Sequence, residues 1–321
     1  MKVLMAGTDI GRCRHEIMVT SALKNHEAGA GLGCGILAYL IWGFFPVYFK
    51  SLASVPSLQV VAHRVVWSIL FLFLLIAVRS RLTDVQNALK SRRSLLILVT
   101  TAFLIATNWL VFIIAVGHAQ VLQASLGYFI TPFVSVLLGF LFLKERLRRM
   151  QLFGMLLATC GVLLLTVQYG HIPWAALTLA LTFGSYGLLR KIVEVDALIG
   201  LTVETFLVAP VALGYLIFVS SNGTGAFPIS GITVNSLLML AGVVTAVPLL
   251  LFATAARRLK LATIGFLQYI TPTLHFLLAV LVYGESFTLS NLSSFILIWS
   301  GLCFYSVDAW LAMRTYRMGL S

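Results

Sequence analysis

Two ionisable groups stand inside long apolar stretches of this sequence, where charge is costly. Glu204 lies within the run from Leu198 to Ser220, and Arg64 follows His63 within the run from Val60 to Val78. An arginine at the centre of a membrane helix costs about 2.5 to 3.5 kcal/mol on insertion scales, and residues of this kind usually serve a function. These positions are therefore the first candidates for chemistry.

Glu204 is the one acidic residue well inside a predicted span. A carboxylate in a membrane can bind and release a proton, so Glu204 is the candidate for a group that couples the protein to protons. The alternative is a static ion pair with a basic residue on the same side of the membrane, either Arg190, Lys191 or Arg257. The sequence leaves both roles open.

Arg64 lies about four residues, or roughly 6 Å at 1.5 Å per residue, inside the outer end of its predicted helix. Its long side chain could reach the headgroups from there. Alternatively, Arg64 faces a cavity or acts in a gate, with Glu285 as a candidate partner on the same side. His63 is grouped with Arg64 as a candidate contact.

Aromatic residues with a polar edge are dense in the apolar stretches. Such side chains suit an aromatic or amphipathic organic solute, because they stack on it and form a few hydrogen bonds. An interfacial belt is the alternative for some of them, and a packing role is the alternative for a buried histidine. The predicted solute contacts are Tyr39, Trp42, His63, Arg64, Asn108, Tyr128, Tyr186, Gln268, Tyr269 and His275.

Two prolines lie inside apolar stretches, at Pro132 and Pro272. A proline within a helix removes a backbone donor, frees a carbonyl and allows a kink. We predict a hinge at each, the alternative being a structural kink in which the preceding threonine bonds back to the helix. The four cysteines have no paired spacing, so the sequence indicates no disulfide, metal site or cofactor.

The elements that carry these residues are membrane helices, because 60% hydrophobic and 10% charged residues over 321 positions do not fit one soluble core. Reading about 17 to 25 mostly apolar residues as one span gives ten helices in an all-α integral membrane fold. They are Gly29 to Phe49, Val60 to Val78, Leu95 to Gly117, Ala124 to Leu143, Leu152 to Val167, Ile172 to Leu189, Leu198 to Ser220, Asn235 to Ala256, Leu261 to Tyr283 and Leu292 to Leu311.

The distribution of basic residues predicts how these helices are oriented. Of the 22 lysines and arginines, 20 fall in the tails and loops of one side, Lys50 lies on the other side, and Arg64 is within a helix. Basic loops face the cytoplasm, so both termini are predicted to be cytoplasmic and the protein to lie in the cytoplasmic membrane. The net charge of +12 is explained by this asymmetry, and no nucleic-acid partner is predicted.

A duplication underlies the ten helices. Seven of the twenty residues from Leu126 to Glu145 recur 140 positions later, ending at Glu285, and the same offset relates Gly161 to Gly301 and Arg64 to Glu204. Each repeat has five helices, an odd number, so the two repeats are predicted to be inverted. The predicted division is a tail at 1–28, repeats at 29–168 and 169–311, and a tail at 312–321. The first tail lacks the apolar core of a signal peptide, and Met18 is an alternative start.

Several segments of the sequence form a recognisable set: Tyr39 to Gly43, His63 to Ser68, Asn108 to Leu110, Ala124 to Ile130, Tyr186 to Lys191, Val247 to Leu250, Leu267 to Ile270 and Tyr283 to Glu285. These segments resemble the RarD proteins, a family in the EamA branch of the drug/metabolite transporter superfamily. The resemblance is collinear from about Gly33 to Ala309 and departs at Thr131 and Thr271, where relatives commonly carry Asn and Gly. It implies a ten-helix permease of the inner membrane with two EamA repeats, linked by name to chloramphenicol sensitivity or resistance.

Inverted repeats place a substrate site near the membrane midplane, so the sequence favours a secondary transporter that works by alternating access. Its expected partners are membrane lipid and a small organic solute. A channel or lipid scramblase is the alternative, and a membrane enzyme is less well supported because no cluster of titratable groups is evident. The natural substrate, the direction of transport, the coupling ion and the oligomeric state do not follow from the sequence.

Overall fold

The computed structural model describes residues 27–117, 121–146, 148–169 and 174–283, with 292–294, 296–301, 303–304, 307–308 and 311. The predicted tail at 312–321 and nearly all of the tail at 1–28 lie outside the described residues, as does Glu285. The duplicated segment is therefore described in full only in its first copy, from Leu126 to Glu145.

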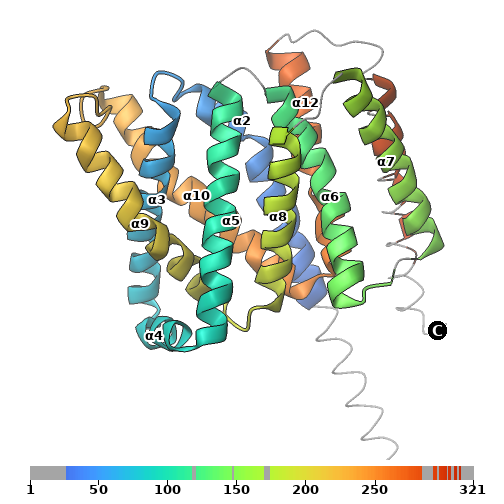
Figure 1. Cartoon of the computed structure of the whole chain (residues 1–321), viewed down its shortest axis with the longest axis horizontal. Helices are drawn as coiled ribbons and strands as arrows, with labels where there is room; N and C mark the ends of the chain where they lie inside the picture. The colour runs from blue at the N-terminus through green and yellow to red at the C-terminus, as the bar shows by residue number, and fades with distance from the viewer. Residues whose placement is uncertain are drawn as a thin grey trace, which may run out of the picture.

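The described residues form helices and connecting turns, with no strand among them. The helices lie side by side in one bundle (Figure 1). Their bounds are 27–43, α2 Phe45–Lys50, α3 Ser57–Val78, α4 Leu82–Lys90, α5 Arg92–Gly117, α6 Val121–Leu143, α7 Arg149–Tyr169, α8 Trp174–Ile192, α9 Ala197–Ser221, α10 Ile232–Arg258, α11 Leu261–Leu267, α12 Ile270–Leu277 and the π-helical turn η1 Leu278–Val282.

Six helical stretches in the described part have the length and apolar composition to cross a membrane. Shorter apolar helices cover Gly127–Leu143, Arg149–Leu164 and Leu292–Gly301. Helix α8 covers most of the predicted span from Ile172 to Leu189. The all-α, multi-pass membrane class is therefore confirmed. The number ten remains a prediction.

Two predicted spans are interrupted where a proline removes a backbone donor. The first was predicted as one helix to Phe49, but it turns at Phe44 and resumes as α2, which has Pro46 in its first turn. The ninth was predicted as one helix, but it breaks between α11 and α12. Pro272 cannot donate to the carbonyl of Gln268, which instead accepts from the Thr271 amide at 3.1 Å. Both breaks lie beside the cavity described below.

The short helix α4 was not predicted. It follows Arg81, which pairs with Asp84 at 2.7 Å and with Asp196, the residue that caps α9, at 3.1 Å. The hydrogen bond to Asp84 raises the pKa of Arg81. This helix is too short and polar for a span. The ion pair of Arg81 with Asp196 ties the α3–α4 turn to the start of α9.

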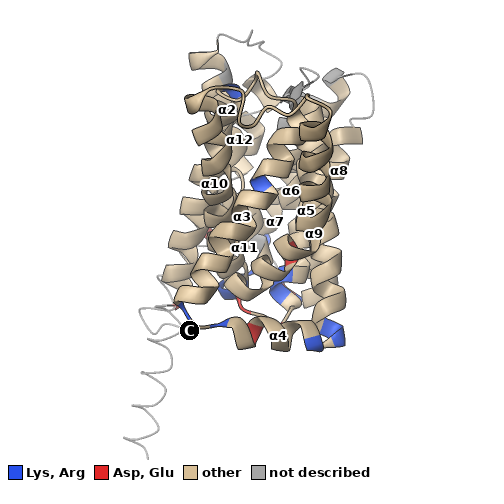
Figure 2. Cartoon of the chain, turned by 90° about the vertical axis from the view of Figure 1, so that its left-hand side faces the viewer, with Lys and Arg blue, Asp and Glu red and all other residues tan. Residues whose placement is uncertain are grey.

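Charge is segregated along the bundle. Lysine and arginine gather at the end that carries α4, while the opposite end shows a basic residue near α2 and another lies at mid-height (Figure 2). The basic residue of α2 is Lys50. The bundle thus has one strongly basic end, as the loop charges predict.

Close helix crossings depend on small residues. A methyl group on Gly242 of α10 would come within 2.4 Å of the Trp67 carbonyl oxygen in α3. At the other side of the bundle, a methyl group on Gly161 of α7 would meet the Ser294 carbonyl at 2.7 Å, and one on Gly301 would meet the Gly154 carbonyl at 2.3 Å. The two glycines related by the 140-residue offset therefore lie in one interface, where small residues let backbones approach.

Candidate substrate cavity

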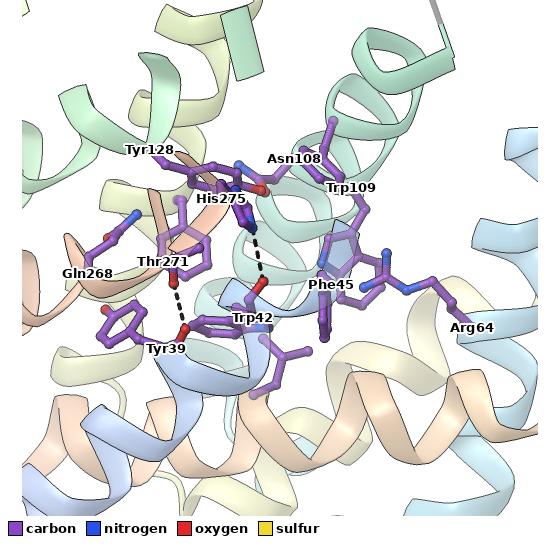
Figure 3. Close-up of a pocket in the computed structure, with 13 residues that line it drawn as sticks. Tyr39, Trp42, Phe45, Arg64, Asn108, Trp109, Tyr128, Gln268, Thr271 and His275 are labelled. Atoms are coloured by element: carbon purple, nitrogen blue, oxygen red, sulfur yellow. Dashed lines mark hydrogen bonds between the residues drawn. The ribbon is translucent and has the colours of Figure 1, made fainter. Parts of the chain in front are cut away.

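A small cavity of about 40 Å³ lies inside the bundle between the helix 27–43, α2, α3, α5, α6, α8, α10, α12 and the break before α12 (Figure 3). Its lining is mainly aromatic, with a few polar groups and one cation. The lining residues are Tyr39, Trp42, Phe45, Arg64, Asn108, Trp109, Phe112, Tyr128, Phe183, Leu249, Gln268, Thr271 and His275.

Seven of the ten predicted solute contacts line this cavity. They come from both halves of the sequence and were chosen for their polar edges and their depth in predicted helices. Whether they contact a solute remains a prediction. The seven are Tyr39, Trp42, Arg64, Asn108, Tyr128, Gln268 and His275.

Arg64 is buried, with 3% of its surface exposed, so its side chain stays inside the helix bundle. Its Nε donates to the Thr245 hydroxyl at 2.9 Å. Its guanidinium lies 4.9 Å from the ring centroid of Trp109, 5.1 Å from that of Phe49 and 5.7 Å from that of Phe45. Cation–π contacts and one hydrogen bond therefore hold the charge at the cavity wall. The predicted partner Glu285 lies outside the described residues.

Two carbonyl groups of the first helix bind side chains from α12. The Trp42 carbonyl oxygen lies 3.1 Å from His275 Nε2, and the Tyr39 carbonyl accepts from the Thr271 hydroxyl at 2.9 Å. The normal donor to Trp42 would be the amide of residue 46, which is a proline. His275 therefore satisfies a carbonyl that Pro46 leaves without its helical partner, and ties the first helix to α12.

The amide side chains in the lining differ in how well they are satisfied. Asn108 donates from Nδ2 to the Leu179 carbonyl at 3.0 Å and to the Thr182 hydroxyl at 2.9 Å, which fixes α5 against α8. Gln268 Oε1 and the Tyr39 hydroxyl are buried without a hydrogen-bond partner among the described residues. Buried polar atoms without a hydrogen-bond partner are unusual in proteins.

Glu204 lies away from this cavity in a buried ion pair with Arg190, at 3.3 Å, and both side chains are almost fully buried. Its carboxylate also accepts from the Thr101 hydroxyl at 2.7 Å and the Tyr186 hydroxyl at 3.2 Å. Of the three basic partners considered, the structure brings Arg190 to Glu204. Lys191 donates to the Leu259 carbonyl and Arg257 to the Val195 carbonyl.

Tyr186 was predicted as a solute contact, but it belongs to the Glu204 cluster and stacks on Phe252 with ring centroids 5.9 Å apart. It precedes Arg190 by four residues on α8, so both side chains lie on one helix face and reach the same carboxylate. The cluster joins α5, α8 and α9 in the half of the bundle nearer the basic end, since Glu204 is in the second turn of α9.

Comparison with known proteins shows the family. Residues 29–167 match the EamA-like transporter family. An "uncharacterized transporter" of Vibrio cholerae is 47% identical over 91% of this chain and 96% of its own length, and "Protein RarD" of Escherichia coli K12 is 42% identical over 88% and 96%. This chain belongs to the RarD proteins of the EamA-like family.

Two further relatives extend the comparison. The "chloramphenicol-sensitive protein RarD" of Pseudomonas aeruginosa is 31% identical to this RarD-family chain over 91% of the chain and 99% of its own length. A solved crystal structure superposes with a TM-score of 0.67 at 17% identity, covering 88% of this chain and 98% of the other, and shows that the two share a fold. The names of several relatives are those of transporters.

His63 of this RarD-family chain lies in a different space from Arg64. It lines a second cleft of about 490 Å³ between α3, the end of α9 and the loop that follows, together with Gln59, Trp67 and Phe227. Its ring lies 5.5 Å from that of Phe227. Neighbouring residues on a helix point about 100° apart, and here Arg64 and His63 line different spaces.

Tyr269 also departs from the prediction. It is buried among Phe129, Phe133 and Phe266, with ring centroids 6.1, 6.5 and 5.9 Å away, and is not among the residues that line the cavity. Its neighbour Gln268 lines the cavity, for the same reason of helical rotation. Tyr269 thus packs helices together in this RarD-family chain.

Part of the lining was not predicted. Thr271 reaches the cavity, although it was considered only as a residue before a proline, and Thr245, the partner of Arg64, gave no signal in the sequence. Phe45, Phe112 and Phe183 also line it, but a phenylalanine in an apolar stretch looks like any other packing residue. A polar threonine on α10 facing a predicted arginine becomes visible only once the helices are paired.

The two duplicated prolines lie in unlike settings. Pro132 is inside the continuous helix α6, and the preceding Thr131 bonds back to the Gly127 carbonyl at 2.8 Å, as the structural alternative predicted. At Pro272 the helix is broken, and Thr271 bonds across to Tyr39. A methyl group on Gly265 of α11 would lie 3.1 Å from the Pro132 carbonyl, so the two proline segments pack against each other. Their hinge role remains a prediction.

Proposed function

We propose that this chain is a secondary transporter that moves a small organic solute across the cytoplasmic membrane by alternating access. The observation that carries this proposal is the internal cavity, lined by polar and aromatic side chains from both sequence halves and set beside two proline-interrupted helices. Broken helices at a central site are typical of secondary transporters. The transporter names of the relatives support the same class.

The size of the cavity supports a cycle with more than one state. A cavity of about 40 Å³ has room for only a few water molecules. Sites for organic ligands enclose about 300 to 1,000 Å³. The helices around the cavity therefore have to separate to admit a solute, and this arrangement corresponds to a contracted state of the proposed cycle.

The proposed topology has ten helices in two inverted five-helix repeats, with both termini in the cytoplasm. The basic end of the bundle supports the orientation. The pair related by the 140-residue offset supports the inversion: Arg64 is in the second turn of α3 and Glu204 in the second turn of α9. These helices run in opposite directions in the bundle (Figure 1), so equivalent residues lie toward opposite ends.

Glu204 is the proposed site of proton coupling. The ion pair with Arg190 favours the ionised carboxylate in the contracted state, because an adjacent cation and two hydroxyl donors stabilise the charge. A helix movement that separated Arg190 from Glu204 would leave a buried carboxylate, which then takes up a proton. In this proposal the ion pair holds the helices together in one state, and Glu204 accepts a proton in the other.

Reconstituted vesicles test the transport class. Vesicles are loaded with an unlabelled extract of small metabolites and supplied with isotope-labelled extract outside, and uptake is followed by mass spectrometry. A carrier gives saturable uptake that is stimulated by internal solute. A channel gives uptake that neither saturates nor responds to internal solute, and a scramblase moves labelled lipid between leaflets instead. Either of these results contradicts the proposal.

A further inference from the structure

Arg64 introduces a positive charge into the cavity that no acidic side chain of the described residues balances. None of the cavity-lining residues is an aspartate or glutamate, and Arg64 forms no ion pair with the described acidic residues. The buried carboxylate of Glu204 is already paired with Arg190. A guanidinium within a membrane protein is costly unless it is paired, so its position at the cavity wall, without a described acidic partner, favours the binding of an anion there.

The contacts of Arg64 leave its two terminal nitrogens, Nη1 and Nη2, without a hydrogen-bond partner among the described residues. The hydrogen bond to Thr245 uses Nε, and the rings of Trp109, Phe49 and Phe45 lie against the guanidinium. No described residue accepts a hydrogen bond from Nη1 or Nη2. Guanidinium N–H groups bind a carboxylate in a two-pronged arrangement, and such charge-assisted bonds are about twice as strong as neutral ones.

The other side chains that line the cavity indicate the chemistry of the uncharged part of the bound molecule. Trp42 and Phe183 meet edge to face with ring centroids 5.5 Å apart, and Phe112 lies 5.7 Å from Tyr128. In Figure 3, Arg64 lies at one side of the cavity and Gln268 at the other, with Trp42 between them. A flat apolar body placed between these ends would contact aromatic rings while its anionic end reaches Arg64.

We propose that the transported solute is an aromatic monocarboxylate, bound by the free guanidinium nitrogens of Arg64. The proposal rests on the proposed function, because it takes the cavity as the substrate site. One uncompensated cation fits one negative charge, and the other polar groups of the lining are neutral amides, hydroxyls and a histidine that already binds the Trp42 carbonyl. Aromatic amides and aromatic cations of the same size are disfavoured.

Matched pairs of acids and amides test this assignment. Thermal unfolding of the purified full chain is measured with benzoate and benzamide, phenylacetate and phenylacetamide, and cinnamate and cinnamide, at neutral pH. The acids are expected to stabilise the protein at concentrations about 10- to 100-fold lower than their amides, as loss of a charge-assisted hydrogen bond predicts. Arg64→Gln should abolish this preference and Arg64→Lys should keep part of it.

Lys50→Gln is the matched control, because Lys50 is a cation near the outer end that rests on the Tyr283 ring and is not part of the cavity. It should leave the preference for acids unchanged. Absence of a preference in the parent protein, including absence of any stabilisation, overturns the proposal even if Arg64→Gln fails to fold. A preference that survives in Arg64→Gln also overturns it.

Vesicle uptake distinguishes failure of the carboxylate assignment from failure of the proposed transport function. Saturable uptake of a neutral solute, without a preference for acids, rejects the carboxylate assignment and leaves the transporter. Stabilisation by acids through Arg64, without uptake of any of them, supports the binding site and rejects the transport function.

Discussion

At the scale of single residues, the Glu204 and Arg190 pair carries the clearest prediction. Glu204→Ala leaves Arg190 buried without its counter-charge and should cost about 3 to 5 kcal/mol of stability. Glu204→Gln retains groups that can bond to Thr101 and Tyr186, so it should lose less stability. If Glu204 couples protons, Glu204→Gln also flattens the dependence of transport on pH.

The double variant Glu204→Gln, Arg190→Gln removes both charges together and separates the two roles. Replacing a buried ion pair by neutral groups is often tolerated, so the unfolding temperature should recover most of what Glu204→Gln loses. The dependence of transport rate on pH should stay flat. Recovery of a normal pH dependence would show that the pair is only structural, and Glu194→Gln, in the exposed turn after α8, controls for loss of an acidic residue.

Sequence reasoning predicted much of the cavity because depth and polarity select residues that an apolar helix would otherwise exclude. It did not separate neighbours on one helix: Arg64 and Gln268 line the cavity while His63 and Tyr269 do not, although the neighbours Asn108 and Trp109 both line it. Which residues face the cavity depends on how each helix is rotated in the bundle. The contact between Arg64 and Thr245 likewise depends on how α3 and α10 pair.

At the scale of helices, the two proline sites should respond differently to substitution. Pro272→Ala supplies a donor for the Gln268 carbonyl and should join α11 to α12, raising stability while transport falls. Pro132→Ala should have a smaller effect, since α6 is already continuous and Thr131 satisfies a neighbouring carbonyl. Thermal unfolding and uptake are measured on both variants, and unchanged transport in both would remove the prolines from the mechanism.

The break at Pro46 shows what the pattern of apolar residues could not reveal. Hydropathy predicts a span from Gly29 to Phe49, yet the chain turns at Phe44 and the Trp42 carbonyl is satisfied by His275. Proline rules alone predict a freed carbonyl at this position. The identity of its new partner requires the tertiary arrangement, because His275 lies more than two hundred residues further along the chain.

The crossing of α3 and α10 gives a prediction about packing. Gly242→Ala places a methyl group against the Trp67 backbone, which cannot move without separating the helices, so the unfolding temperature should fall. Gly214→Ala on α9 is the matched control. No atom lies within 4 Å of its added methyl group, and alanine should stabilise that helix by about 0.5 to 1 kcal/mol. Equal effects of the two substitutions would contradict this packing.

At the scale of the whole molecule, the fold class followed from composition, and the uneven ends of the bundle followed from the loop charges. The topology is tested with fusions to a reporter that is active only outside the cytoplasmic membrane. Fusions after Arg93 and after Ser321 should be inactive, because both positions are predicted to be cytoplasmic. Activity at either position would rule out the orientation with both termini inside.

The central claim, that the cavity opens to one side of the membrane at a time, is tested most directly by labelling Phe112→Cys in a chain whose native cysteines are replaced. Phe112 lines the cavity. In sealed vesicles of each orientation, a membrane-impermeant thiol reagent should label this position from either side, and the reagent should not cross the membrane. Labelling from one side only, or leakage of the reagent through the protein, would contradict alternating access.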